Sequence, residues 1–492
     1  MNMLARLRPQ DSLQWGFVAF VGVLLMSGAA ALVLKQPLAL LPVLGFIGVL
    51  IGVLQWRWLF YLLFATLPFS REISLPGGLS MDVPSEPLML ALTGCIGLAL
   101  LLRGGRPLGR AELRHPLTII LALMLVWTAA TTLFSVDTTK SVKYLLAKGW
   151  YLTPFLLGTL LIVRRPSQVW GLMLTYVGSS VLAVLYVMGR HAATGFTFAS
   201  INHAVGPFYR NHVIYATTLA LLLPFAWYAA QASNSRWSRL AWRGAGAVLL
   251  LGLLTAYTRA SLLALPVAGL YYLVMWRRLT WALLLVAGLS FMGLGLYFSD
   301  SSRFMRFAPE FEKTIFNGDN FEKHLEATYK LEDVSGMERV YRWVAASRMI
   351  ADRPITGSGA ATFYPEYKRY TISGFRTYVS DNPEKSTTHN YFLLQLAEQG
   401  LPGFALFFLL LSVALLLAER LYHRSRVAQH RQVVLAATLS LVIIVFHLLL
   451  NELVEVDKIG AVFFVCLALL IRAEGWVAAE EPATAAGPAS AR

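Results

Sequence analysis

The chain alternates between long apolar runs and short polar loops. A helix that crosses a membrane needs about 17–25 mostly apolar residues, and fourteen runs are candidates for such helices. They begin near Trp15, Leu38, Trp58, Pro87, Leu117, Leu145, Gln168, Val213, Gly244, Ser261, Thr280, Pro402, Val433 and Gly460. The runs at Trp58 and Gly244 are short enough to be re-entrant, so we predict an all-α polytopic membrane protein with about 12–14 spanning helices.

The composition agrees with this pattern. Hydrophobic residues make up 57% of the 492 residues and charged residues only 14%, whereas soluble domains carry about 25% charged residues. These values exclude a soluble enzyme, a disordered chain and a fibre. Cys95 and Cys466 both lie inside apolar runs, which argues against a disulfide framework and against a cysteine-based metal site.

The positions of the basic residues indicate how the chain is oriented in the membrane. The net charge is +15, but most arginines lie in short loops, which is typical of membrane topology and not of nucleic-acid binding. With the N-terminus in the cytoplasm, alternation of the spans brings every short basic loop to the same side. These loops carry Arg57, Arg103, Arg106, Arg110, Arg114, Arg164, Arg165, Arg236, Arg239, Arg243, Arg277, Arg278, Arg420, Arg424, Arg426 and Arg431. We therefore expect both termini in the cytoplasm.

The opposite side receives one large polar segment. The sequence divides into residues 1–298 with about 11 spans, a large helical periplasmic loop over residues 299–400, residues 401–472 with about three further spans, and a disordered cytoplasmic tail over residues 473–492. The loop is the only part that reads as a small water-facing domain, so we look there for chemistry.

The middle of this loop predicts a helix followed by a turn. Arg339 and Arg342 are three residues apart, so they project from one face of a helix that Pro354 ends. Gly357 and Gly359 follow and allow a tight loop that could bring backbone N–H groups close to a ligand.

The end of the loop predicts a short helix. We expect this helix to start at His389 and to stop at Gly400, and a spanning helix to begin near Pro402. His389 would then lie in the first turn, where the helix dipole disfavours imidazolium and leaves a neutral base. The same helix end attracts phosphate.

One spacing carries a family resemblance. The pattern His389-Asn390, nine residues, Gly400, two residues, Gly403 resembles the signature of the bacterial O-antigen ligase, O-antigen polymerase and protein O-oligosaccharyltransferase superfamily. The next position is usually Gly, Thr or Tyr in that family and is Phe404 here, which disfavours the protein-glycosylating members.

Two further stretches resemble the same superfamily. The stretch "RVYRWVAASRMIADRPITGSGAATFYPEY" resembles the segment that precedes the signature, and "YTRASLLALP", which contains Arg259, resembles an element at an outer helix junction. The resemblance covers residues 255–408, and the N-terminal half matches only in hydropathy.

The resemblance implies a GT-C-like glycosyltransferase in the bacterial inner membrane, with its active site on the periplasmic face. Such enzymes move a glycan from an undecaprenyl-diphosphate carrier to an acceptor hydroxyl, with inversion and without a metal or another cofactor. A ligase uses a lipid A-core acceptor and a polymerase extends the glycan. We favour the ligase, and the motifs do not separate the two. The expected partners are the lipid-linked donor, the acceptor and membrane lipids, with no nucleic acid.

The resemblance also implies roles for individual residues. His389 would take the proton of the acceptor hydroxyl. Arg259, together with Arg342 or Arg339, would hold the diphosphate, because guanidinium matches phosphate geometry. Arg210 is a third candidate for the diphosphate. The residues expected to shape the site are Asn390, Gly400, Gly403, Gly357 and Gly359.

Each of these residues also has a plain structural interpretation. His389 could be a capping residue, Arg259 could reach the lipid headgroups, and Arg339 and Arg342 could form a solvated helix face. Two other classes of function make different predictions. A polysaccharide transporter or flippase would show an internal repeat and charges near the midplane, and the sequence shows neither. A scaffold or sensor would use the loop only to bind a partner.

Overall fold

The computed structural model describes residues 21–30, 55–75, 79–103, 108–298, 334–371, 382 and 386–480. The predicted run at Leu38 and most of the run at Trp15 lie outside these residues, as do residues 299–333 of the predicted loop. Of the Trp15 run, the structure describes the short helix Val21–Ala30.

Nine helices in the described residues are long and apolar enough to cross a membrane, and each coincides with a predicted run. They are α5 (Pro116–Leu133), the Thr138–Ile162 span that joins α6 (Thr138–Leu152), η4 (Thr153–Gly158) and α7 (Thr159–Ile162), α8 (Pro166–Ala192), α10 (His212–Gln231), α12 (Arg259–Trp276), α13 (Thr280–Phe298), α17 (Tyr391–Arg424), α18 (Ala428–Leu448) and α19 (Asp457–Ala478). The chain is an all-α polytopic membrane protein, as predicted.

The remaining predicted runs form helices outside these nine. The helix at residues 55–66 is short, and α3 (Ser85–Arg103) is apolar from Pro87 to Leu102. The Gly244 run is the second half of α11 (Arg236–Leu254), whose first half carries arginines. A small antiparallel hairpin of β1 (Arg71–Leu75) and β2 (Leu79–Val83) was not predicted.

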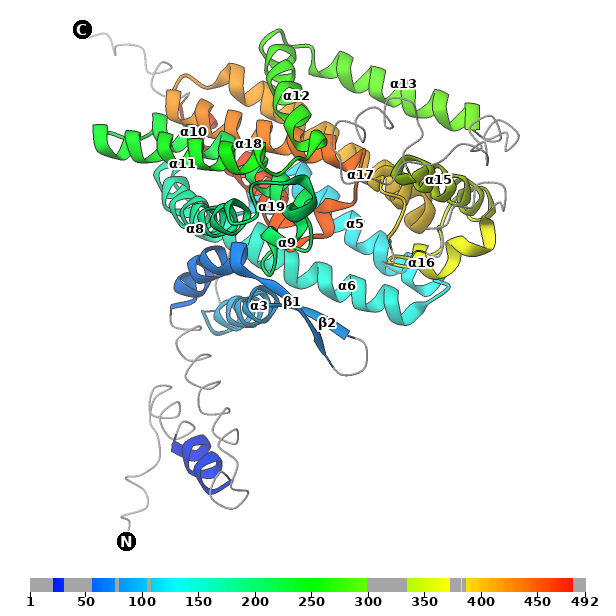
Figure 1. Ribbon diagram of the computed structural model, residues 1–492, viewed down its shortest axis with the longest axis horizontal. Coiled ribbons are helices and arrows are strands. Elements are labelled where there is room, and N and C mark those ends of the chain that lie inside the picture. The colour runs from blue at the N-terminus through cyan, green and yellow to red at the C-terminus, as the bar shows by residue number, and fades with distance from the viewer. Residues whose placement is uncertain are drawn as a thin grey trace, which may run out of the picture.

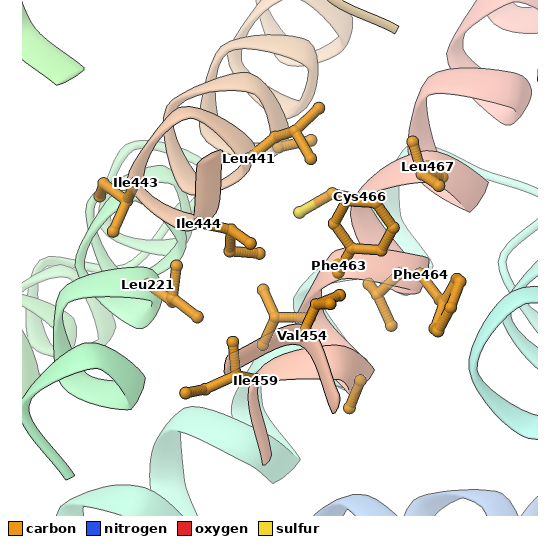
Figure 2. Close-up of a cluster of buried hydrophobic side chains, with 14 of the residues drawn as sticks. Leu221, Leu441, Ile443, Ile444, Val454, Ile459, Phe463, Phe464, Cys466 and Leu467 are labelled. Carbon is orange, nitrogen blue, oxygen red and sulfur yellow. The ribbon is translucent and has the colours of Figure 1, made fainter. Parts of the chain in front are cut away.

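The centre of the bundle lies where α10, α18 and α19 meet. Figure 2 shows their side chains interdigitating, with Leu221 from α10, Ile444 from α18 and Phe463 from α19, and all three are buried. These helices are apolar all round, which is typical of helices enclosed by others. In contrast, only 6% of the 18 residues Thr280–Tyr297 of α13 are buried, and Figure 1 shows this helix along the edge of the bundle.

Contacts between distant loops define two ends of the bundle. At one end, which we call the basic end, Trp476 Nε1 donates to the Arg164 carbonyl at 2.9 Å, and His423 Nε2 donates to the Met275 carbonyl at 2.8 Å. These contacts and the packing of His430 on Trp476 bring the basic loops at residues 164–165, 277–278 and 420–431 together. The opposite end contains His389, and we call it the histidine end. The arginine count thus grouped the loops correctly, and which side of the membrane each end faces stays a prediction.

The predicted tail needs a correction. It was expected to begin at residue 473, but α19 continues to Ala478. The reason is packing, because Trp476 is tied to the Arg164 carbonyl and Val477 is buried. Residues 481–492 lie outside the described part of the chain.

Candidate functional site

The candidate site is built where α15 (Val334–Asp352) lies against the start of α17. Figure 1 shows α15 and α16 (Phe363–Glu366) beside that end of α17. Trp343 Nε1 of α15 donates to the Thr388 carbonyl at 2.8 Å, and an Arg342 guanidinium nitrogen donates to the Thr387 carbonyl at 3.4 Å. These bonds fix the residues that precede α17.

The backbone at His389 corrects one expectation. Asn390 is the N-cap of α17, and its Oδ1 accepts a hydrogen bond from the Leu393 amide at 3.0 Å. The helix therefore begins at Tyr391, and His389 lies before it instead of in its first turn. His389 has a φ of +51°, a left-handed conformation that is uncommon for residues other than glycine. Asn390 occupies the N-cap position because the short amide side chain of asparagine is among the most favourable there.

The imidazole of His389 is half-buried and makes one hydrogen bond to the described residues. Its Nδ1 lies 3.3 Å from Asn451 Oδ1. An amide oxygen only accepts hydrogen bonds, so Nδ1 carries the proton and Nε2 keeps its lone pair. Within the described part of the chain Nε2 has no hydrogen-bond partner, and it is the atom that can accept a proton.

Four charged or polar neighbours set the protonation of His389. Burial lowers the pKa of His389, the Glu452 carboxylate raises it, the Arg342 and Arg339 guanidinium groups lower it, and the bond to Asn451 raises it. The net shift is downward from 6.5, so the imidazole is neutral near pH 7. The sequence predicted a neutral base from the helix dipole, but burial and the two arginines are the actual causes.

The arginine that the sequence favoured is held rigidly. The Arg342 guanidinium lies 3.3 Å from the Glu338 carboxylate one turn earlier, and both side chains are only 7% exposed. Its Nε is buried without a hydrogen-bond partner among the described residues. A buried guanidinium with one unsatisfied donor is costly, and it is suited to receive an anion.

Arg259 lies at the same end of the bundle. It is the first residue of α12 and is half-buried. It makes no hydrogen bond or ion pair to any residue that the structure describes. Ser261, in the first turn of α12, bonds to His447 at the end of α18, and Asn451 follows His447 by four residues. The structure therefore links Arg259 to His389 through α18 and shows no direct contact between the two.

Arg210 lies elsewhere. Its guanidinium pairs with Glu72 of β1 and is 68% exposed. Burial raises the pKa of Glu72, but hydrogen bonds from Ser80 and Arg210 bring it below its ordinary value. The structure does not bring Arg210 to His389, and its described partner is the hairpin.

The break at Gly400 is present as predicted. Gly400 has a φ of +67°, which interrupts α17. A Cβ at this position would overlap the Ile355 carbonyl, and the next amide, of Leu401, donates to the Pro354 carbonyl at 2.8 Å. At Gly403, a Cβ would overlap the Gln399 side chain and approach Trp127 Cδ1 at 3.4 Å. Both glycines allow close packing.

Gly357 and Gly359 serve a different purpose from the predicted one. The Gly357 amide donates to the Arg353 carbonyl at 3.1 Å, and the Gly359 amide donates to the Glu398 carbonyl at 2.9 Å. A Cβ at Gly357 would overlap the backbone of Glu398, and one at Gly359 would overlap Ser135. These N–H groups do not face a ligand, so that expectation was wrong. The glycines let the loop dock on α17.

Two residues of the site, Asn451 and Glu452, were not predicted from the sequence. They lie in the loop after α18, where Glu452 Oε2 is buried with no hydrogen-bond partner in the described ranges. One signal was available, since they are an adjacent polar pair between two apolar runs. Nothing in the spacing related them to His389, which is about sixty residues away.

The same loop anchors the start of α17. Glu455 accepts hydrogen bonds from Tyr391 Oη at 2.8 Å, from Tyr144 Oη at 3.0 Å and from Lys148 Nζ at 2.7 and 2.8 Å. Tyr391 is two residues after His389, so α6, α17 and this loop are fixed relative to one another at the histidine end.

Residues 244–408 match the family model described as O-antigen ligase. The match covers about a third of the chain and includes Arg259, α15 and the start of α17. It supports membership of the O-antigen ligase superfamily, whose members are glycosyltransferase-like ligases or polymerases. No curated protein matches the chain.

Proposed function

We propose that this chain is a ligase that transfers a glycan from an undecaprenyl-diphosphate carrier to an acceptor hydroxyl. The proposal starts from membership in the O-antigen ligase superfamily. The observation that carries the proposal is the arrangement of His389. Its Nδ1 is bonded to Asn451, its Nε2 has no partner in the described residues, and two guanidinium groups lie close enough to lower its pKa.

The proposed reaction needs one proton transfer and one displacement. His389 Nε2 takes the proton from the acceptor hydroxyl as the oxygen attacks the anomeric carbon. A new carbon–oxygen bond forms, the bond to the diphosphate breaks, and the electron pair leaves with the diphosphate. Attack from the side opposite the leaving group inverts the anomeric centre. The downward shift of the His389 pKa supports this role, because the base is unprotonated near neutral pH.

The arginines are proposed to stabilise the leaving diphosphate. Arg342 is held by Glu338 and the Thr387 carbonyl, so its orientation is set before substrate binds, which is what electrostatic stabilisation of a leaving group requires. Arg339 and Arg259 supply further positive charge at the same end of the bundle. In this proposal these guanidinium groups take the place that a divalent cation has in other phosphate chemistry.

The proposed place of the reaction is the periplasmic face of the inner membrane. The described basic loops lie at the opposite end from His389, and basic loops are typical of the cytoplasmic side. A lipid-linked donor would reach the histidine end from the outer leaflet. The proposed acceptor is lipid A-core or a similar hydroxyl-bearing lipid.

The fate of the lipid-linked glycan in a deletion strain tests this proposal. A missing ligase leaves long glycan chains on the carrier, and plasmid-borne parent protein clears them. Single repeat units attached to the surface lipid would instead mean a polymerase. If neither glycan pool changes on deletion, the chain is not a transferase of this class, and a scaffold or transporter would have to be considered again.

A further inference from the structure

A buried hydrogen-bond chain lies beside the candidate site, outside the residues assigned to the reaction so far. His447 Nδ1 lies 2.8 Å from the Ile443 carbonyl, its Nε2 lies 2.9 Å from Ser261 Oγ, and Thr217 Oγ1 lies 3.3 Å from Ser261 Oγ. The three side chains are fully buried. They come from α10, α12 and α18.

The direction of each bond follows from chemistry. A carbonyl only accepts, so His447 Nδ1 carries the proton and Nε2 accepts from Ser261. Ser261 has then used its single proton, so the Thr217 hydroxyl donates to Ser261. Every donor in the chain has one acceptor, and a fully satisfied buried network of this kind holds its members in one arrangement.

Both partners of the Ser261–His447 bond lead to the candidate site. On one side, Ser261 is two residues after Arg259, in the first turn of α12. On the other side, the His447 carbonyl accepts from the amides of Leu450 at 2.9 Å and Asn451 at 2.8 Å. Asn451 in turn bonds to Nδ1 of His389. The bond between Ser261 and His447 therefore connects the helix of Arg259 to the loop that orients His389.

We propose that Ser261 and His447 are positioning residues that set the separation between the Arg259 guanidinium and the His389 imidazole. The inference rests on the proposed function, since it assigns these groups the diphosphate and the acceptor proton. Neither residue touches the substrate in this scheme. They act by holding α12 against the end of α18, because a misplacement of about 1 Å between reacting groups can cost a factor on the order of a hundred in rate.

The protein contains a second buried serine bond that serves as a matched control for the Ser261–His447 bond. Ser440 Oγ of α18 donates to the Leu221 carbonyl of α10 at 2.8 Å. Ser440 is fully buried like Ser261, and it also joins two helices of the bundle. It lies two turns before His447 and has no bond to the loop that carries Asn451. Ser440→Ala therefore removes a similar buried bond without loosening the site.

The test measures glycan transfer from an undecaprenyl-diphosphate oligosaccharide by purified parent, Ser261→Ala, Ser261→Thr and Ser440→Ala proteins. Ser261→Ala should lower kcat about tenfold, with little change in KM for the donor. It should also move the acidic limb of the pH–rate profile to lower pH, because a displaced Asn451 no longer supports protonation of His389. Ser261→Thr keeps the hydroxyl and should recover most of kcat, and Ser440→Ala should keep the kcat and the pH profile of the parent.

Several outcomes would overturn the inference. An unchanged kcat in Ser261→Ala, or an equal loss in Ser261→Ala and Ser440→Ala, would mean that the bond is only structural. An unmoved pH limb would mean the same. Absence of transfer by the parent itself would instead contradict the proposed function, and the inference would fall with it.

Discussion

The two ends of the bundle each hold a partly buried histidine with a carboxylate near it, and the surroundings of the two pairs differ. At the basic end, His430 Nδ1 lies 2.5 Å from Glu480 Oε1, and Glu480 also accepts from Ser425 Oγ at 2.9 Å, the Arg426 amide at 2.6 Å and the Val427 amide at 3.2 Å. Although burial raises the pKa of Glu480, these hydrogen bonds bring it below its ordinary value.

At the histidine end, the corresponding groups are not satisfied. Glu452 Oε2 and Arg342 Nε are buried without hydrogen-bond partners in the described residues. Leaving such atoms unpaired costs free energy, on the order of 1–3 kcal/mol for each group. The comparison shows that the carboxylate at the basic end has hydrogen bonds to both of its oxygens and serves folding, whereas a site able to bind substrate keeps some atoms unpaired.

The largest expected difference between the two ends is in their exposure to the outside of the cell. Both native cysteines are buried, so single cysteines can be introduced as labelling sites. Lys140→Cys at the histidine end, where the side chain is 49% exposed, should react with a membrane-impermeant maleimide in cells with a permeabilised outer membrane. Arg236→Cys at the basic end should react only after lysis. The reverse pattern would contradict the proposed orientation.

The next difference is in catalysis. His389→Ala should lower the transfer rate about a thousandfold, because a general base contributes roughly 10²–10⁴-fold. His430→Ala removes a histidine at the basic end that is also partly buried, and it should leave the rate close to that of the parent. The measurement is release of glycan from the lipid-linked donor. Equal rates for His389→Ala and the parent would exclude His389 as the base.

A smaller effect separates the charges around His389. Arg342→Gln removes a positive neighbour, so the pKa of His389 should rise and the acidic limb of the pH–rate profile should move to higher pH. Glu452→Gln removes a negative neighbour, so the limb should move to lower pH. The measurement is kcat/KM against pH for both variants and the parent. Shifts in the same direction would mean that the limb does not report His389.

The smallest effect concerns the break in α17. Gly400→Ala should lower the free energy of unfolding by at least about 2 kcal/mol, because an L residue at this φ is strained and its Cβ would overlap the Ile355 carbonyl. Gly269→Ala in α12 is the control, since a Cβ there meets nothing within 4 Å and alanine favours a helix by about 0.5–1 kcal/mol. Thermal unfolding in detergent measures both. A Gly400→Ala protein as stable as the parent would contradict the close approach.

Much of the architecture could be predicted because hydropathy is a local property. Each of the nine described spans coincides with a predicted apolar run, and the arginine count grouped the described basic loops at one end. The hairpin of β1 and β2 was missed because its strands are five residues each and lie between two apolar runs. The extension of α19 was missed because the contact of Trp476 with the Arg164 carbonyl depends on residues far apart in the sequence.

The candidate site divides along the same line. The sequence by itself determined the helix of Arg339 and Arg342, the break at Gly400 and the family signature around His389, since all of these depend on neighbours within about a dozen residues. The tertiary structure alone decided that Asn451 bonds to His389, that Glu452 lies near it, and that Arg210 pairs with Glu72 instead. The physical reason is that burial and electrostatic interactions act through space, so a residue in one loop can fix the proton of a histidine in another without any trace in the spacing between them.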